Sequence, residues 1–352
     1  MKYKVLGSSN LKVSELCLGT MTFGEEFGIG APETECRRVF DAFLAAGGNF
    51  LDTADIYNGG TSERMVGKFA AADRDYLVLA SKYSLNTRPD DPNAGGSHRK
   101  NLVQSLDGTL RRLGTGYVDL YWVHGWDGAT NLEALMRALD DQVRAGKILH
   151  LGISNAPAWV IAAANTLARE RGWTPFTAMQ LQYSLIERSI ERDYFALARA
   201  QDMAITPWSP LAGGLLTGKF DRDANAGAGD EARLKSNERW SRFLKDDNLA
   251  VAEAVSAMAR EIGCSTAQLA LAWMMRRSSA CVVPIIGART LPQLDDNLGA
   301  VTVDLSPERL ASLDELTALA PEYPNSLYAS EFFETMMYGE VSPRIELNEP
   351  WT

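Results

Sequence analysis

Cysteines, histidines and long apolar runs are scarce or missing in this sequence. The four cysteines show no paired spacing, so we expect small buried thiols in a reducing cytoplasm rather than a disulfide framework. The three histidines are scattered, with no cysteine or carboxylate cluster beside them, which argues against a metal site. No apolar stretch is long enough for a signal peptide or a bilayer span. Because the formal net charge is -10, we expect neither nucleic acid nor a membrane as a partner.

Apolar residues make up 46% of the 352 positions, which is enough for a sizeable core. After a short hairpin predicted over residues 2–13, apolar runs without polar alternation are typical of parallel strands covered on both faces. The predicted strands span residues 16–19, 49–53, 77–82, 118–124, 148–154, 177–181, 204–208 and 281–285. Segments with helical periodicity lie between them, for example residues 34–46, 62–71, 99–113, 131–145, 158–171 and 192–200.

This alternation predicts an α/β fold of the (β/α)8 TIM-barrel class, because about eight strands with intervening helices match that barrel in size. A doubly wound sheet is the competing fold, and it usually carries a G-x-G-x-x-G turn after its first strand. Residues 18–24 (LGTMTFG) follow the first strand without that spacing, which favours the barrel. No composition break marks a second domain, so residues 1–352 are predicted to form one domain.

Three segments stand out from the repeated unit. The long loops at residues 86–97 and 213–247 follow strands, so they should rise on the C-terminal face and could cover a site. Residues 321–352 form a C-terminal extension that we expect to be ordered over the barrel or a partner, although packing alone would also explain its aromatic content. Its aromatic residues include Tyr323, Tyr328, Phe332, Phe333 and Tyr338.

Four polar residues fall where successive strands should end. Asp52 ends the second predicted strand, Lys82 the third and His124 the fourth, and Tyr57 lies in the loop after Asp52. Taken singly, they suit a turn cap, a solvated charge, a core histidine and a surface tyrosine. Residues that end neighbouring barrel strands converge on one mouth, however, and a lysine buried there needs a counter-charge such as Asp52.

Together the four side chains suit the reduction of a carbonyl group. A tyrosine can protonate the developing alkoxide, a lysine can favour the phenolate form, an aspartate can hold the lysine charged, and a histidine can orient the carbonyl. A barrel lyase or isomerase using Tyr57 and Lys82 without a nicotinamide is an alternative. It leaves Trp208, Asn155 and Arg289 without a joint explanation.

The chain resembles the aldo-keto reductases, and among them the aryl-alcohol-dehydrogenase-like branch, from Met1 to about Ala320. Any one of the shared phrases is weak evidence, whereas their order along the chain is highly specific. The phrases are LGTMTFG (18–24), DTADIY (52–57), LGTGYVDL (113–120), GK (146–147), GISN (152–155), WSPL (208–211), GKF (218–220) and GAR (287–289).

The resemblance implies an NADPH-dependent, reversible reduction of aldehydes and ketones, with aryl or small aliphatic aldehydes as substrates. Tyr57 would be the general acid, Lys82 would stabilise its phenolate, Asp52 would partner the lysine, and His124 would orient the carbonyl. Some proteins of this fold are instead cofactor-sensing regulatory subunits with little turnover. Their best-known members carry asparagine where His124 stands here, so the histidine favours an enzyme.

The resemblance also implies an extended cofactor site. Trp208 would stack on the nicotinamide ring, and an arginine just after the eighth strand suits phosphate oxygens. The carboxamide would be bonded by Ser154, Asn155 and Gln180; the pyrophosphate by Ser209, Leu211, Gly213 and Lys219; and the adenosine end with its 2′-phosphate by Arg289, Gln293 and Asn297. The other predicted cofactor contacts are Gly19, Thr20, Met21, Asp52, Pro210 and Gly287.

Two positions depart from the pattern of many relatives. Gly287 and Ala288 precede Arg289 where serine or lysine is common, which weakens the preference for NADPH and leaves NADH open. Gly125 follows His124 where bulkier residues are common, which would open the substrate end of the site. The sequence does not decide the oligomeric state, and a homo-oligomer remains open.

Overall fold

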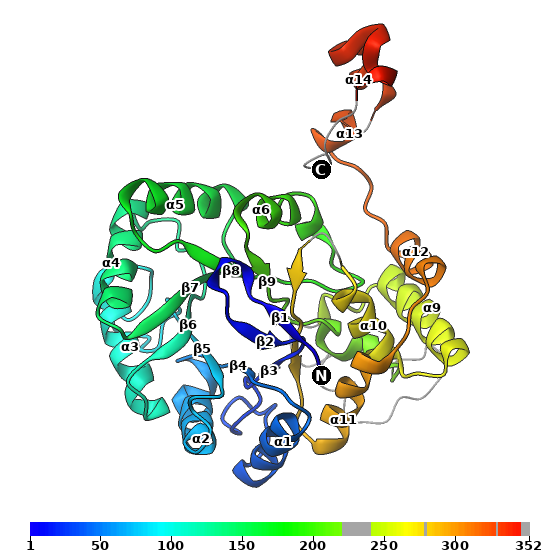
Figure 1. Ribbon diagram of the computed structural model, residues 1–352. Helices are drawn as coiled ribbons and strands as arrows, with labels where there is room; N and C mark the ends of the chain where they lie inside the picture. The colour runs from blue at the N-terminus through cyan, green and yellow to red at the C-terminus, as the bar shows by residue number, and fades with distance from the viewer. Residues whose placement is uncertain (220–240, 278–279, 329, 346–352) are drawn as a thin grey trace.

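A parallel sheet closed into a barrel forms the centre of the computed structural model, which describes residues 1–219, 241–277, 280–328 and 330–345 (Figure 1). The strands follow one another around the barrel in the order β10-β9-β8-β7-β6-β5-β4-β3-β11. Their bounds are β3 Cys17–Gly19, β4 Phe50–Asp52, β5 Val78–Tyr83, β6 Val118–Val123, β7 Ile148–Ser154, β8 Phe176–Gln180, β9 Ala204–Ile205, β10 Cys281–Val282 and β11 Ile285–Gly287.

Strands β10 and β11 are two parts of one eighth strand, and together they close the barrel. β10 pairs with β9, whereas β11 pairs with β3, and only Val283 and Pro284 separate the two. Proline has no backbone N–H to donate, which accounts for the interruption. The carbonyl of Pro284 still accepts a bond from the Cys17 N–H at 2.9 Å. The predicted (β/α)8 barrel is therefore confirmed.

Helices surround the barrel, and most predicted bounds agree with the observed ones to within one residue. The helices between strands are α1 Glu33–Ala45, α2 Thr61–Ala70, α3 Arg99–Leu113, α4 Leu132–Arg144, α5 Ala158–Arg171 and α6 Tyr194–Gln201. Further along the chain lie α9 Asp246–Ile262, α10 Thr266–Met275, α11 Leu291–Gly299 and α12 Pro307–Leu316. None of the helices in the described ranges is long and apolar enough to cross a membrane.

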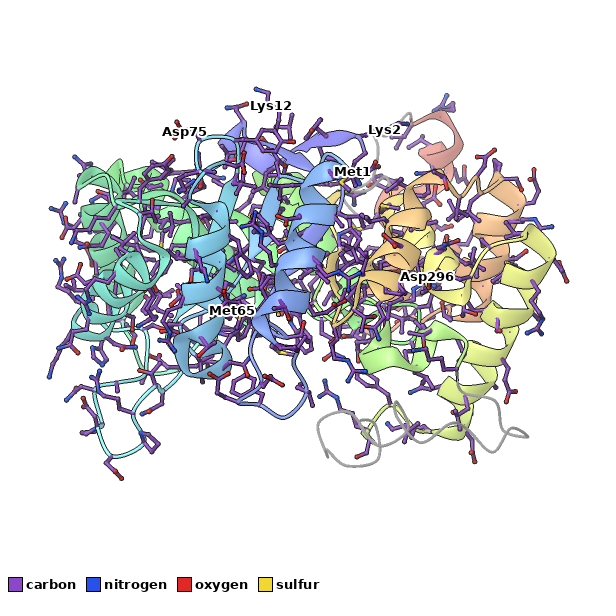
Figure 2. All side chains as sticks on the ribbon, turned by 90° about the horizontal axis from the view of Figure 1, so that it is seen from below. Met1, Lys2, Lys12, Met65, Asp75 and Asp296 are labelled. Atoms are coloured by element: carbon purple, nitrogen blue, oxygen red, sulfur yellow. The ribbon has the colours of Figure 1, made fainter. Side chains whose placement is uncertain are left out.

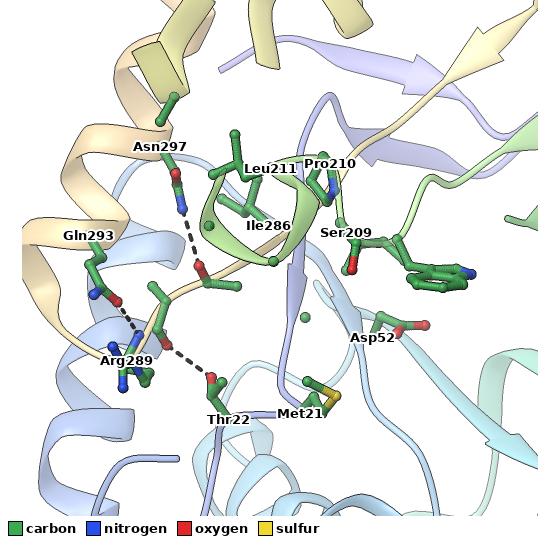
Figure 3. Close-up of a pocket in the computed structure, with 18 of the residues that line it drawn as sticks. Met21, Thr22, Asp52, Ser209, Pro210, Leu211, Ile286, Arg289, Gln293 and Asn297 are labelled. Carbon is green, nitrogen blue, oxygen red and sulfur yellow. Dashed lines mark hydrogen bonds between the residues drawn. The ribbon is translucent and has the colours of Figure 1, made fainter. Parts of the chain in front are cut away.

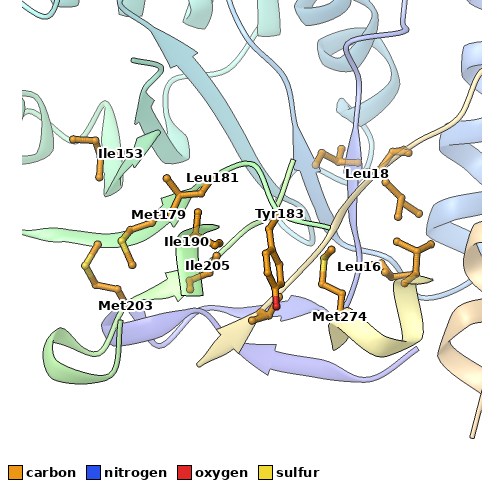
Figure 4. Close-up of a cluster of buried hydrophobic side chains, with 14 of the residues drawn as sticks. Leu16, Leu18, Ile153, Met179, Leu181, Tyr183, Ile190, Met203, Ile205 and Met274 are labelled. Carbon is orange, nitrogen blue, oxygen red and sulfur yellow. The ribbon is translucent and has the colours of Figure 1, made fainter. Parts of the chain in front are cut away.

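Two apolar clusters occupy the two faces of the sheet. The inner cluster fills the barrel with side chains such as Phe50, Val78 and Leu120, while a larger outer cluster lies between strands and helices. Figure 4 shows part of the outer cluster. The predicted hairpin, formed by β1 Tyr3–Val5 and β2 Lys12–Ser14, contributes Val13 to the inner cluster and so closes the N-terminal end of the barrel.

The C-terminal ends of the strands lie at the other end of the barrel. Loop 86–97 projects there, opposite the labelled residues Lys2 and Lys12 of the hairpin segment (Figure 2). Loop 213–247 begins in a short 3-10 helix, Ala212–Thr217, and residues 220–240 of it lie outside the described ranges. The open end of the barrel is therefore the end that the predicted catalytic residues share.

The expectation that the C-terminal extension lies over the barrel is wrong, and its alternative, that the extension lies over a partner, stays a prediction. Helices α13 Asn325–Tyr328 and α14 Glu331–Tyr338 project away from it (Figure 1). The side chain of Phe332 is 68% exposed, and Met336 and Met337 are similarly exposed. The base of the extension is held by an ion pair of 2.9 Å between Arg192 and Glu322.

Candidate active site

The side chains of Asp52, Lys82 and His124 share the inner face of three neighbouring strands. Side chains alternate between the faces of a strand. Phe50 belongs to the inner cluster, so Asp52, two residues on, also faces inward. Val78 and Ala80 of the next strand also belong to the inner cluster, so Lys82, two residues after Ala80, faces inward. Leu120 and Trp122 belong to it as well, which places His124 on the same inner face. Because β4, β5 and β6 are adjacent, the three side chains converge at the C-terminal end of the barrel.

Lys82 is fully buried, and its ammonium group uses its three protons within the protein. Its Nζ donates to the carboxylate of Asp52, to the carbonyl of Thr53 at 2.7 Å and to the hydroxyl of Tyr57 at 3.0 Å. Burial by itself would lower the pKa of Lys82, but Asp52 and Tyr57 outweigh it and raise that pKa above its usual value. Lys82 is therefore a fixed cation directed at the oxygen of Tyr57.

Tyr57 begins a tight turn, Tyr57–Gly60, whose shape is set by Asn58. Asn58, Gly59 and Gly60 all have left-handed φ angles, 47°, 60° and 87°. The Asn58 amide donates to the carbonyls of Met21 and Phe23 at 2.9 and 3.0 Å, and its oxygen accepts from the N–H of Phe27 at 2.8 Å. The turn is thus fastened to the loop after β3. The Tyr57 ring lies edge-on to His124, with centroids 6.0 Å apart.

A series of hydrogen bonds connects the Asp52 carboxylate to Trp208. Gln180 donates to the free oxygen of Asp52 at 2.9 Å, and Ser154 donates to the carbonyl of Gln180 at 2.8 Å. Asn155, at a left-handed φ of 50°, donates to the carbonyl of His124 at 2.9 Å and accepts from the Trp208 indole at 3.1 Å. The Asn155 amide also donates to the Ser154 hydroxyl at 2.9 Å, so the series is continuous and the indole is held beside the residues at the mouth.

A cavity of about 430 Å³ runs from these residues toward α11 (Figure 3). Almost every predicted site residue lines it: Gly19, Met21, Asp52, Tyr57, His124, Ser154, Asn155, Gln180, Trp208, Ser209, Pro210, Leu211, Gly213, Lys219, Gly287, Arg289, Gln293 and Asn297. Lys82 lies behind the wall, beneath Tyr57. The prediction for Thr20 is corrected: it is fully buried, and its hydroxyl bonds to the carbonyl of Asp52 and to Ser62 instead of facing the cavity.

At the far end, hydrogen bonds hold the chain around Arg289 in place (Figure 3). The Arg289 N–H donates to Gln293 at 2.9 Å, and Asn297 donates to the carbonyl of Gly287 at 3.2 Å. Thr22 donates to the carbonyl of Ala288 at 3.1 Å. This end of the cavity is thus a rigid edge formed by β11 and the first turns of α11.

Sequence reasoning missed several lining residues. They are Thr22, Gly214, Thr217, Ala267, Ile285, Ile286, Ala288, Pro292 and Asp296. Asp296 could have been found, because positions 293, 296 and 297 share one face of a helix. Most of the others present backbone or small apolar surface and carry no chemical signal in the sequence.

The residues present suit a phosphorylated dinucleotide. A fixed aromatic ring and amides lie at one end, and the cations Lys219 and Arg289 also line the cavity. A Cβ added to Gly214 or Gly287 would meet no heavy atom within 4 Å, so open space lies beside the backbone at both positions. The volume is within the range of about 300–1,000 Å³ usual for small-molecule sites.

The chain is similar in sequence to known reductases and dehydrogenases. The aldo/keto reductase family model matches residues 15–318. The chain is 35% identical over 340 residues to an aryl-alcohol dehydrogenase [NADP(+)] of Phanerodontia chrysosporium, covering 90% of this chain and 86% of the relative. It is 33% identical over 328 residues to norsolorinic acid reductase stcV of Emericella nidulans, covering 90% and 81%. A putative aryl-alcohol dehydrogenase, AAD14, of Saccharomyces cerevisiae is 31% identical over 341 residues, covering 92% and 88%.

Proposed function

The chain belongs to the aldo/keto reductase family, whose members are oxidoreductases acting on small carbonyl compounds, and we propose that it reduces aldehydes and ketones with NADPH. The observation that carries this proposal is the 3.0 Å hydrogen bond from Lys82 to the hydroxyl of Tyr57 at the end of the cavity, with Asp52 behind the lysine. The reaction is reversible toward the alcohol.

In the proposed complex the cofactor extends along the cavity. Trp208 provides the surface for the nicotinamide ring, with Ser154, Asn155 and Gln180 around its carboxamide. Lys219 and the residues after Trp208 hold the pyrophosphate. Arg289, Gln293 and Asn297 hold the adenosine end, where the guanidinium favours a 2′-phosphate and therefore NADPH over NADH. When bound, the nicotinamide supplies the hydride that reaches the carbonyl carbon.

The protein supplies the proton and the electrostatic stabilisation. As negative charge develops on the carbonyl oxygen, Tyr57 gives its hydroxyl proton to that oxygen. Lys82 stabilises the phenolate left behind, and Asp52 keeps the lysine charged and in place. His124, next to Tyr57 at the mouth, orients the carbonyl oxygen toward the hydroxyl. The donors are fixed before substrate arrives, so little reorganisation is needed during the reaction.

Aryl aldehydes are the proposed substrates, with small aliphatic aldehydes second. Apolar residues on three loops at the C-terminal end of the barrel, outside the lining of the cavity itself, support this choice. Phe27 follows β3 and is tied to the Tyr57 turn through Asn58, while Leu85 follows β5 and Trp126 follows β6. Relatives named for aryl alcohols and for norsolorinic acid point in the same direction. The cytoplasmic location expected from the sequence and a homo-oligomer stay predictions.

Replacement of Tyr57 by phenylalanine tests the proton transfer. General acid catalysis contributes about 10²–10⁴-fold, so Tyr57→Phe should lower kcat for an aryl aldehyde at least about a hundredfold. Quenching of tryptophan fluorescence by NADPH should be retained. Tyr76→Phe, at an exposed tyrosine, is the matched control and should keep wild-type kcat. A Tyr57→Phe enzyme within tenfold of wild type would exclude the assignment.

The cofactor preference is tested by binding. Titrations of NADPH and NADH, followed by tryptophan fluorescence, should show tighter binding of NADPH. Arg289→Leu should weaken NADPH about tenfold or more and leave NADH nearly unchanged, because a charge-assisted bond contributes about 1.5–3 kcal/mol. Equal affinities in the wild type would show that the Gly287-Ala288 departure governs the choice. Clear binding without turnover of any aldehyde would indicate a regulatory subunit.

A further inference from the structure

Asp55 is a buried carboxyl group that the proposed mechanism leaves unused. It lies two residues before Tyr57, and only 4% of its accessible surface is exposed to solvent. It does not line the cavity. Its side chain instead faces the layer between the barrel and the helices, where Glu63 of α2, Arg112 of α3 and Tyr121 of β6 act on its charge. The Ser105 hydroxyl and the Ile56 N–H are the donors nearest the carboxyl, and neither reaches full hydrogen-bond geometry with its oxygens in the part of the chain that the structure describes.

The cation that acts on Asp55 in this layer, Arg112, is already paired with Glu63. Both oxygens of the fully buried Glu63 are taken, one by the hydroxyl of Ser81 and the other by Arg112, each at 2.5 Å. Arg112 is the cation that acts on Asp55 and already neutralises Glu63; the remaining nearby groups, Ser105 and Tyr121, are neutral hydroxyls. Burial, reinforced by Glu63, raises the pKa of Asp55 to about 7.

The same segment of chain connects Asp55 to the catalytic hydroxyl. The Asp55 N–H donates to the carbonyl of Lys82 at 3.3 Å, and the Tyr57 N–H donates to the carbonyl of Ala54 at 3.2 Å. Arg112 lies against the other end of the turn, since a Cβ added to Gly60 would come within 2.8 Å of its Cδ. A second negative charge beside Glu63 would therefore act on both ends of the turn that begins with Tyr57.

We propose that Asp55 is a positioning residue whose neutral form keeps the hydroxyl of Tyr57 in line with Lys82, so that turnover declines when Asp55 ionises. This role rests on the proposed reductase function. The neutral carboxyl fits the buried layer without a counter-ion. The ionised carboxylate is repelled by Glu63 and moves the short segment between Ala54 and Tyr57, lengthening the contact between Lys82 and the tyrosine oxygen.

The test compares kcat of the wild type and Asp55→Asn from about pH 6 to about pH 8.5 at saturating NADPH, with an aryl aldehyde as substrate. Asparagine is nearly isosteric with the neutral acid. The two enzymes should agree within about twofold at the low end, and Asp55→Asn should be about fivefold or more faster at the high end. Asp75→Asn, at an exposed aspartate, should follow the wild-type profile.

Parallel profiles of active enzymes would overturn the role of Asp55 and leave the reductase function intact. A purely structural role would produce this result, because it would change the unfolding midpoint without changing the shape of the kcat profile. Absence of turnover by the wild type at every pH would refute the proposed function and this role together. Asp55→Ala removes the same charge and must give the same loss of pH dependence. It replaces Asp55→Asn in the comparison if that variant does not fold.

Discussion

Removing one charge of the Asp52–Lys82 pair should cost far more stability than removing both. Lys82 is 0% exposed and Asp52 only 2% exposed. Lys82→Met would leave the Asp52 carboxylate with Gln180 as its remaining side-chain partner. Asp52→Asn would leave a buried ammonium facing only neutral acceptors, namely the new amide oxygen, a carbonyl and a hydroxyl. Breaking a buried pair in this way costs about 3–5 kcal/mol, because the remaining charge is uncompensated.

The double variant Asp52→Asn/Lys82→Met removes both charges at once. Replacing a buried pair by neutral groups is often close to neutral, so the double variant should lie within about 2 kcal/mol of wild type. The two single changes then sum to about 6–10 kcal/mol, which gives a coupling of at least about 4 kcal/mol. Activity should not return with stability, because the group that stabilises the phenolate of Tyr57 is still missing.

Urea unfolding followed by circular dichroism measures these differences in the four proteins of the cycle. The exposed pair Arg37–Asp41, with nitrogen and oxygen 2.8 Å apart, is the control cycle and should show a coupling below about 1 kcal/mol. A double variant as unstable as the sum of its singles would refute the uncompensated-charge argument. Recovery of activity in the double variant would refute the catalytic role of Lys82.

Four further outcomes are expected. Since the pKa of Asp55 is raised to about 7, the free energy of unfolding of the wild type should fall relative to that of Asp55→Asn as the pH rises from about 4 to 7. Urea unfolding above pH 7 should show the wild type to have lost about 4 kcal/mol relative to the variant. Gly152→Ala should lower stability by about 1–3 kcal/mol or more, because its Cβ would lie 2.2 Å from the ring of Trp122. Asn58→Gly should be more stable than Asn58→Ala by about 1 kcal/mol in the same assay, since φ at this position is 47°. Deleting residues 321–352 should shift the melting temperature by less than about 2 °C in scanning calorimetry, because its large side chains in the described ranges are mostly exposed.

Glycine and proline residues explain where the predicted boundaries of helices and strands were accurate and where they were not. Helices α3 and α5 have the predicted bounds, and each ends at a glycine with a left-handed φ, Gly114 and Gly172. The strand predicted over residues 204–208 ends at Ile205, because Pro207 cannot donate to a neighbouring strand. Proline likewise divides the eighth strand. Such local rules operate within a few residues, so the sequence displays them.

The positions of Asp52, Lys82 and His124 could be predicted because two simple structural rules act together. Side chains alternate along each strand, and parallel barrel strands bring their C-terminal ends to one mouth. Given the strands, the convergence of these residues follows without further information. The lining of the cavity was harder to predict. Thr20 neighbours two lining residues in sequence, but its side chain turns away from the cavity, toward Ser62 of α2.

By itself the sequence determined the barrel, the order of its elements and the set of polar residues at its mouth, because periodicity and turn chemistry are local properties of the chain. Only the tertiary structure decided which charges meet in the layer behind the mouth. Asp55, Glu63 and Arg112 come from a loop and two helices, and their balance depends on helix packing that no local pattern encodes. The same reason applies to α14, whose apolar side chains gave no sign in the sequence that they would remain uncovered by the barrel.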